Sequence, residues 1–142
     1  MLIYICEDTK SDLMRLKRHL DKFSKEKLFS YDMISFSRGE ELLAAFRQAD
    51  LRPELVFLDI YMGGKNGIDT ARQLRCMDYS GGIIFTTSST EHAMDSYEVN
   101  ALYYLQKPYD YKHFLSAMER CGDIFQRTHR REVLHRLVQG GC

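Results

Sequence analysis

The feature that most constrains the fold of this chain is a short apolar segment that ends on a carboxylate. Residues 55–58 read Leu-Val-Phe-Leu, with Pro53 before them and Asp59 directly after them. An apolar run of this length between turn-forming residues predicts a strand buried on both faces, as in parallel sheets. Ligands of open parallel sheets lie beyond the carboxyl ends of the strands, so Asp59 lies where a functional site is expected. An Asp that only opens the turn at Gly63-Gly64 is the alternative that this segment leaves open.

Short apolar runs and helical patterns alternate along the rest of the chain. Apolar residues recur at helical spacing after each predicted strand, which indicates amphipathic helices. Together with the segment before Asp59, the predicted strands are residues 2–6, 31–36, 83–87 and 101–105. The helices that follow are expected to begin near Thr9 or Ser11, Ser37, Gly67, Thr90 and Asp110. Five strands alternating with five helices predict an α/β fold whose parallel strands are joined by right-handed crossovers.

Four of the predicted strands end on polar or charged residues. In chain order, these residues are Glu7, Asp8, Asp59, Thr87 and Lys107. A parallel sheet collects its carboxyl ends along one edge, so three carboxylates, a hydroxyl and an ammonium are expected to meet there. Three carboxylates so close together repel one another unless a cation intervenes, and oxygen-only ligands of this kind suit Mg²⁺.

The residue types at this edge predict phosphoryl chemistry. A Lys neutralises the charge of a phosphoryl group, and a Thr hydroxyl donates a hydrogen bond to one of its oxygens. Asp59 remains as the nucleophile, because an Asp carboxylate can form an acyl phosphate. Each residue alone has an ordinary structural explanation, such as an acidic turn, a capping hydroxyl or a solvated surface lysine. Their occurrence together at successive strand ends favours a site.

With these motifs the chain resembles the response-regulator receiver domains of two-component signalling, over residues 1–125. The resemblance rests on the acid pair Glu7-Asp8, the segment from Asp59 to Gly67, Thr87 followed by a small residue, and Tyr104-Leu-Gln-Lys107-Pro108. It implies a flavodoxin-like, doubly wound sheet of five parallel strands in the order 2-1-3-4-5. It also implies a cis peptide bond between Lys107 and Pro108.

The resemblance assigns the acidic residues to a phosphoacceptor and a metal site. It implies that Asp59 is the phosphoacceptor and that Mg²⁺ is held by Glu7, Asp8, Asp59 and the backbone carbonyl of Tyr61. The family usually has Pro where Gly63 stands. A Gly-Gly loop is more flexible and loses more entropy on ordering, so we expect weaker Mg²⁺ affinity without loss of a ligand.

The remaining motif residues are assigned to the phosphoryl group and to a switch. The resemblance implies that Thr87 and Lys107 contact the phosphoryl group and that Thr87 and Tyr104 change conformation together. The surface of residues 90–105 and the last helix is then expected to form a homodimer. A sensor histidine kinase is the implied phosphodonor. Only self-phosphorylation and slow self-dephosphorylation are expected, so we predict a signalling domain and not an enzyme.

Residues 98–108 most resemble regulators that carry a LytTR-type (LytR/AgrA-like) DNA-binding domain. Residues 126–142 are therefore expected to be a C-terminal helix extension, a linker towards a DNA-binding domain absent from this chain. Residues 127–136 hold four Arg and one Glu, which leaves 16 basic and 19 acidic residues in 1–126. Four Arg in a short tail attract nucleic acid only weakly, so DNA contact is expected only through the output domain.

Composition argues for a cytoplasmic protein. No apolar run approaches the roughly 20 residues that span a bilayer, and the N-terminus lacks the basic region of a signal peptide. We therefore expect no membrane association. The four cysteines show no C-x-x-C spacing, which favours reduced thiols, three of them acting as small core residues.

Two other functions stay open from the residues alone. The first is an Mg²⁺-dependent phosphatase with an aspartyl nucleophile, but such enzymes commonly have a second Asp where this chain has Tyr61. The second is a flavodoxin-like cofactor-binding domain, which needs a phosphate-cradling loop after the first strand. That loop is acidic here, at residues 7–10, and the hydroxyl-rich segment 86–90 is the remaining candidate.

Overall fold

The computed structural model describes residues 1–62, 66–89, 91–122 and 124. The strands are β1 (Leu2–Cys6), β2 (Asp32–Phe36), β3 (Leu55–Asp59), β4 (Gly82–Thr87) and β5 (Tyr103–Gln106). The helices are α1 (Lys10–Lys27), α2 (Gly39–Gln48), α3 (Gly67–Cys76), α4 (Ala93–Glu98) and α5 (Tyr111–Glu119). All strand pairs are parallel, and the sheet order is β2-β1-β3-β4-β5, so the predicted fold class and strand order are confirmed.

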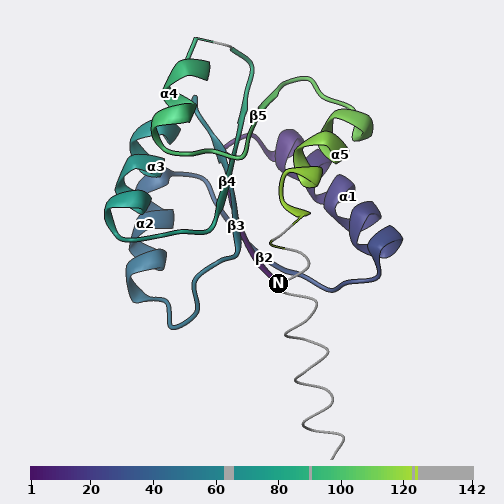
Figure 1. Ribbon diagram of the computed structural model, residues 1–142, viewed down its shortest axis with the longest axis horizontal. Coiled ribbons are helices and arrows are strands. Elements are labelled where there is room, and N and C mark those ends of the chain that lie inside the picture. The colour runs from purple at the N-terminus through teal and green to yellow at the C-terminus, as the bar shows by residue number, and fades with distance from the viewer. Residues whose placement is uncertain (63–65, 90, 123, 125–142) are drawn as a thin grey trace, which may run out of the picture.

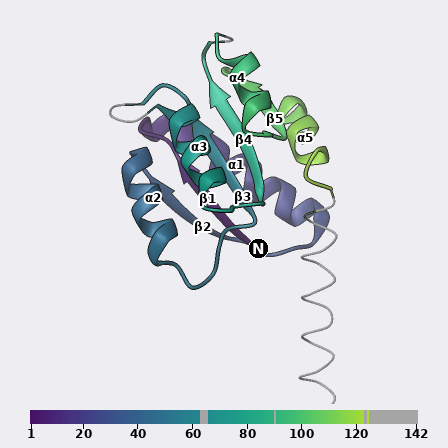
Figure 2. The ribbon, with the colours of Figure 1, turned by 60° about the vertical axis from the view of Figure 1, so that its left-hand side comes forward.

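The sheet lies between two layers of helices (Figure 1). Helices α2, α3 and α4 cover one face, and α1 and α5 cover the other. Figure 2 turns α2 and α3 forward, with α1 seen behind the strands. Each face has its own hydrophobic core. We call them the α2–α3 cluster, which includes Tyr4, Leu58 and Leu74, and the α1–α5 cluster, which includes Phe57 and Phe114.

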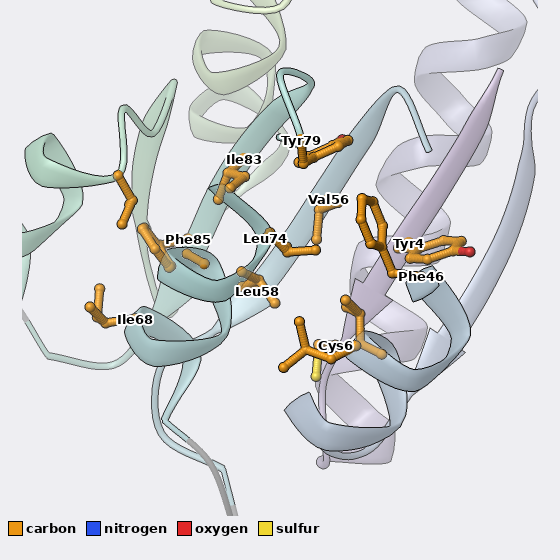
Figure 3. Close-up of a cluster of buried hydrophobic side chains, with 14 of the residues drawn as sticks. Tyr4, Cys6, Phe46, Val56, Leu58, Ile68, Leu74, Tyr79, Ile83 and Phe85 are labelled. Atoms are coloured by element: carbon orange, nitrogen blue, oxygen red, sulfur yellow. The ribbon is translucent and has the colours of Figure 1, made fainter. Parts of the chain in front are cut away.

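Strand β3 is the centre of both cores. All five of its residues are buried, as the apolar run predicted, because β1 and β4 flank it and helices cover both faces. Its side chains alternate between the faces, with Val56 and Leu58 in the α2–α3 cluster and Leu55 and Phe57 in the α1–α5 cluster. Figure 3 shows Val56 and Leu58 beside Leu74 of α3. Each such side chain contributes about 1.5–3 kcal/mol by leaving water.

The helix starts differ from the sequence expectation in one respect. Thr9 is the N-cap of α1, but it makes no side-chain cap hydrogen bond, and its hydroxyl donates to Asp8 Oδ1 at 3.5 Å instead. Asp110 does cap α5, because its Oδ1 accepts the N–H of His113 at 2.9 Å. Asn66 caps α3 in the same way through the N–H of Ile68. The short polar side chains thus cap α3 and α5 but not α1.

The expectation that three cysteines are core residues is correct for two of the cysteines in the described part of the chain. Cys6 and Cys121 are buried as expected, whereas Cys76 is exposed because it falls on the outer side of the last turn of α3. Gly63 and the extension over residues 126–142 lie outside the described residues. None of the helices in the described part of the chain combines the length and the hydropathy that a transmembrane span requires.

Candidate functional site

Asp59 lies at the carboxyl end of β3 and is only 5% exposed. Its Oδ1 accepts the backbone N–H of Tyr61 at 3.2 Å. Gly67 makes this corner possible: its N–H donates to Ile60 O at 3.1 Å, and a Cβ at position 67 would overlap the carbonyl oxygen of Asp59. Only glycine allows this close approach, so α3 can begin directly against the backbone of the buried carboxylate.

Lys107 follows β5 and reaches across the edge of the sheet to three carboxylates. Its Nζ donates to Glu7 Oε1 at 2.6 Å, to Asp12 Oδ2 at 3.0 Å and to Asp59 Oδ2 at 3.2 Å. The peptide bond to Pro108 is cis, and the backbone N–H of Lys107 donates to Thr87 O at 2.7 Å. The predicted meeting of Glu7, Asp59 and Lys107 is therefore present.

The electrostatics of this edge are governed by an excess of negative charge. Burial alone would lower the pKa of Lys107, but its hydrogen bonds to Glu7 and Asp12 raise it above the usual value, so the side chain is a charged ammonium. Burial and the neighbouring Asp59 raise the pKa of Glu7 to about 9, although Lys107 acts in the opposite direction. Burial alone would raise the pKa of Asp12, but its hydrogen bond from Lys107 lowers it. With a pKa of about 9, the Glu7 carboxyl group holds a proton near neutral pH, and a bound cation would displace that proton.

The same edge holds a group of oxygens suited to a hard divalent cation. Carboxylate oxygens of Glu7, Asp8 and Asp59 all lie within 4.8 Å of one another. Glu7 and Asp59 are buried, whereas Asp8 is exposed. Glu7 Oε2 is buried and has no hydrogen-bond partner among the described residues, which leaves it available to a cation. Three carboxylates with an unsatisfied buried oxygen fit Mg²⁺ or a similar ion.

Thr87 ends β4 and Tyr104 lies on the neighbouring strand β5, and both bind the same loop residue. The Thr87 side chain is fully buried, and its Oγ1 accepts the N–H of Ser89 at 3.3 Å. The Tyr104 hydroxyl donates to Ser89 O at 2.6 Å. Tyr104 packs against the α2–α3 cluster, whereas Lys107 meets Asp12 of α1 on the opposite face, so the expected opposite orientation of these two side chains is confirmed.

Two contacts at this edge were not predicted from the sequence. The first is that of Asp12 in the first turn of α1, where an acid is ordinarily explained by the helix dipole. Helical spacing does not pair it with Asp8, because α1 begins at Lys10. The second contact joins the Tyr61 hydroxyl to Glu91 Oε2 at 2.9 Å, with the ring of His92 beside Tyr61. No sequence pattern predicted that second contact.

Comparisons with known proteins agree with the geometry. The family model described as the response regulator receiver domain matches residues 3–119. Sensory transduction protein LytT of Bacillus subtilis is 34% identical over 90 residues, which are 63% of this chain and 37% of that protein. The matched part is thus little more than a third of that relative's length.

Solved structures show the same fold. The response regulatory domain of protein mrkE from Klebsiella pneumoniae has a TM-score of 0.78 at 21% identity, over 89% of this chain and 99% of that one. The Mn²⁺-bound form of response regulator Rcp1 has a TM-score of 0.66 at 21% identity, over 84% of this chain and 91% of that one. At these identities the likeness concerns the fold alone.

Proposed function

This chain belongs to the response regulator receiver domain family, and from that premise we propose that it accepts a phosphoryl group on Asp59 from a sensor histidine kinase. The single observation that carries the proposal is the contact of Lys107 Nζ with Asp59 Oδ2 at 3.2 Å, in a pocket where both side chains are largely buried. A buried carboxylate with a fixed ammonium beside it is equipped to hold a transferred phosphoryl group.

In the proposed reaction a carboxylate oxygen of Asp59 attacks the phosphorus of the donor. An O–P bond forms while the bond between phosphorus and the leaving group breaks, and the leaving group departs with the electron pair. A phosphohistidine donor leaves as an imidazole whose nitrogen takes a proton from water, and acetyl phosphate leaves acetate. Lys107 offsets part of the charge on the transferring group.

We infer that Mg²⁺ is the cofactor and that Glu7, Asp8, Asp59 and the backbone carbonyl of Tyr61 hold it. Support comes from the clustered carboxylate oxygens and from the unpaired Glu7 Oε2. A Mn²⁺-bound response regulator of the same fold also supports a divalent cation here. When bound, the ion supplies positive charge against the phosphoryl oxygens. The residues of this chain orient the acceptor: Tyr61 N–H and Lys107 each bind one oxygen of Asp59.

The proposed switch passes through Ser89. We propose that the Thr87 hydroxyl donates to a phosphoryl oxygen, and that the rotation which brings it towards Asp59 moves its oxygen away from the N–H of Ser89. Tyr104 binds the carbonyl of the same residue, so the two side chains act on one short loop. We expect Tyr104 to move with Thr87, to remodel the surface of β5, α4 and α5, and to favour a homodimer. The two states must differ by only a few kcal/mol for one phosphoryl group to select between them.

Output is proposed to lie in a separate domain. The resemblance of residues 98–108 to LytTR-type regulators supports a role in transcription regulation, with DNA bound through an output domain joined by residues 126–142. Residues 1–142 without that domain are expected to bind DNA poorly. The cytoplasmic location expected from the sequence also stays a prediction.

Neither alternative function is favoured by the geometry. Tyr61 occupies the position where an aspartyl-nucleophile phosphatase needs its general acid, and its hydroxyl binds Glu91 instead. The loop after β1 presents Glu7 and Asp8, which repel a cofactor phosphate.

Mass spectrometry tests the acceptor. Incubation with Mg²⁺ and acetyl phosphate should add one phosphoryl group to the wild type, and none without Mg²⁺ or in Asp59→Asn. An undiminished adduct in Asp59→Asn would refute the assignment.

Beryllium fluoride, which mimics the phosphoryl group, tests the switch. Wild type should gain mass in sedimentation and change amide protection over residues 88–105. An identical response from Thr87→Ala, or no response in the wild type, would count against it.

A further inference from the structure

Within the described part of the chain, Asp12 is the one carboxylate bound by the Lys107 ammonium that the proposed metal site does not include. It lies in the first turn of α1, and its Oδ2 accepts from Lys107 Nζ at 3.0 Å. Both side chains are mostly buried, with 28% of Asp12 and 16% of Lys107 exposed. Among the described residues, the group of carboxylates close enough to share a metal ion comprises Glu7, Asp8 and Asp59.

The contact with Asp12 occupies one of the three N–H donors of the Lys107 ammonium. A lysine ammonium has three N–H donors. Here each has a carboxylate acceptor, and the acceptors come from three different elements: Glu7 follows β1, Asp12 belongs to α1 and Asp59 ends β3. Since the lysine stem is flexible, a fixed position of Nζ depends on these acceptors.

Phosphorylation changes the three acceptors unequally. Once an oxygen of Asp59 is bonded to phosphorus, the donor that it held is released to a phosphoryl oxygen. Glu7 binds the ammonium through Oε1 and is also a proposed cation ligand through Oε2. Asp12 neither bonds to phosphorus nor belongs to the proposed cation site, so its contact with Lys107 can persist throughout the reaction.

We propose that Asp12 is a positioning residue that holds the Lys107 ammonium beside Asp59, from the side of α1, before and after phosphoryl transfer. The inference rests on the proposed acceptor function of Asp59. Asp12 does not touch the phosphoryl group; it acts through Lys107.

The test compares Asp12→Asn and Asp12→Glu with wild type, Asp8→Asn and Glu41→Gln. Glu41 is the matched control, because it is an exposed carboxylate in the first turn of α2 and its change removes the same charge. The direct readout is the ¹H–¹⁵N resonance of the Lys107 ammonium, assigned with Lys107→Met and recorded without phosphodonor. A hydrogen-bonded ammonium exchanges its protons with water slowly enough to be seen. We expect the resonance in wild type and Glu41→Gln, its loss in Asp12→Asn, and partial recovery in Asp12→Glu.

The kinetic readout is phosphorylation by acetyl phosphate at several donor concentrations. In Asp12→Asn the maximal rate should fall up to about ten-fold, because the amide oxygen can still accept a hydrogen bond but lacks the charge that strengthens it. The donor concentration at half-maximal rate and the Mg²⁺ affinity should stay near wild type.

A resonance and a maximal rate that match wild type in Asp12→Asn would overturn the proposal. A loss of Mg²⁺ affinity as large as in Asp8→Asn would overturn it too, by making Asp12 a metal ligand. If wild type itself accepts no phosphoryl group, the proposed function fails. The ammonium resonance then still decides whether Asp12 holds Lys107.

Discussion

Two cationic side chains at opposite ends of the sheet are held in different ways. Lys107, at the carboxyl edge, meets three carboxylates. Arg75, in the last turn of α3 near the other edge, lies over the Tyr79 ring at 5.6 Å, and its hydrogen bonds within the described part of the chain go to backbone carbonyls. Its partners are the carbonyl oxygens of Val99, Tyr79, Gly81 and Asn100, at 2.7–3.2 Å.

This difference indicates that the edge with Arg75 stabilises the fold, whereas the edge with Lys107 can bind further charged groups. Neutral carbonyls accept most of the N–H donors of Arg75 and tie the turn before β4 to the turn after α4, and burial lowers the pKa of Arg75. At the Lys107 edge the carboxylates outnumber the ammonium, and the pKa of Lys107 is raised. Excess charge at a buried edge costs stability unless further positive charge arrives. An edge of that kind favours binding of a cation.

The largest expected effect comes from removing Lys107. Lys107→Met should slow phosphorylation by acetyl phosphate about 100- to 1000-fold, as for the loss of one preorganised charge-stabilising donor. Rates measured by mass spectrometry at saturating Mg²⁺ provide the test. Arg75→Met is the control and should keep the wild-type rate. Equal losses of phosphorylation rate in both variants would contradict the proposed difference between the two edges.

The next effect is on stability. Arg75→Met should lower the free energy of unfolding by about 2–3 kcal/mol, because hydrogen bonds from a charged group to carbonyls are lost and part of their surroundings is dry. Urea denaturation measures it. An unchanged midpoint of urea denaturation would show that water replaces the guanidinium without loss of stability, and that Arg75 does not stabilise the two turns that it joins.

A smaller effect concerns the cation at the carboxyl edge. Asp8→Asn removes a hard oxygen ligand and one negative charge, so Mg²⁺ should bind about ten-fold more weakly, roughly 1.4 kcal/mol. Mg²⁺ should also raise the melting temperature of wild type more than that of the variant. Superimposable Mg²⁺ titrations of the two folded proteins would contradict the assignment.

The smallest effect concerns His19, a third side chain with a basic group. Its ring stacks on Phe114, and its buried Nε2 has no hydrogen-bond partner among the described residues. Burial lowers the pKa of His19, and the charge of Arg15 lowers it further, although Asp110 opposes this. Its contribution to stability is therefore present above the unfolded-state pKa of about 6.5 and is lost as pH falls through the lower folded-state value.

Urea denaturation at several pH values between neutral and acid tests this. Wild type should lose more stability on acidification than His19→Phe, which keeps the ring contacts but cannot bind a proton. Parallel curves would show that His19 meets an acceptor when it is charged, as Lys107 and Arg75 do.

The sequence by itself determined the sheet and most of its functional edge. Apolar runs such as residues 55–58, all of them buried, predict strands because the pattern of apolar and turn-forming residues is a local property of the chain. A parallel sheet then brings its carboxyl ends together, so Glu7, Asp59 and Lys107 could be predicted to meet. The odd spacing of Tyr104 and Lys107 likewise predicts that their side chains lie on opposite faces of the sheet.

Only the tertiary structure decided which atoms meet. Asp12 and Lys107 are 95 residues apart, and their contact depends on how α1 packs against the sheet. The acceptors of Arg75 are backbone carbonyls, which every residue carries, so no sequence pattern marks them. The exposure of Cys76 depends on which side of the last turn of α3 faces solvent. Local periodicity predicts elements and their order, whereas long-range packing selects the individual hydrogen bonds, because these depend on distances that no local pattern encodes.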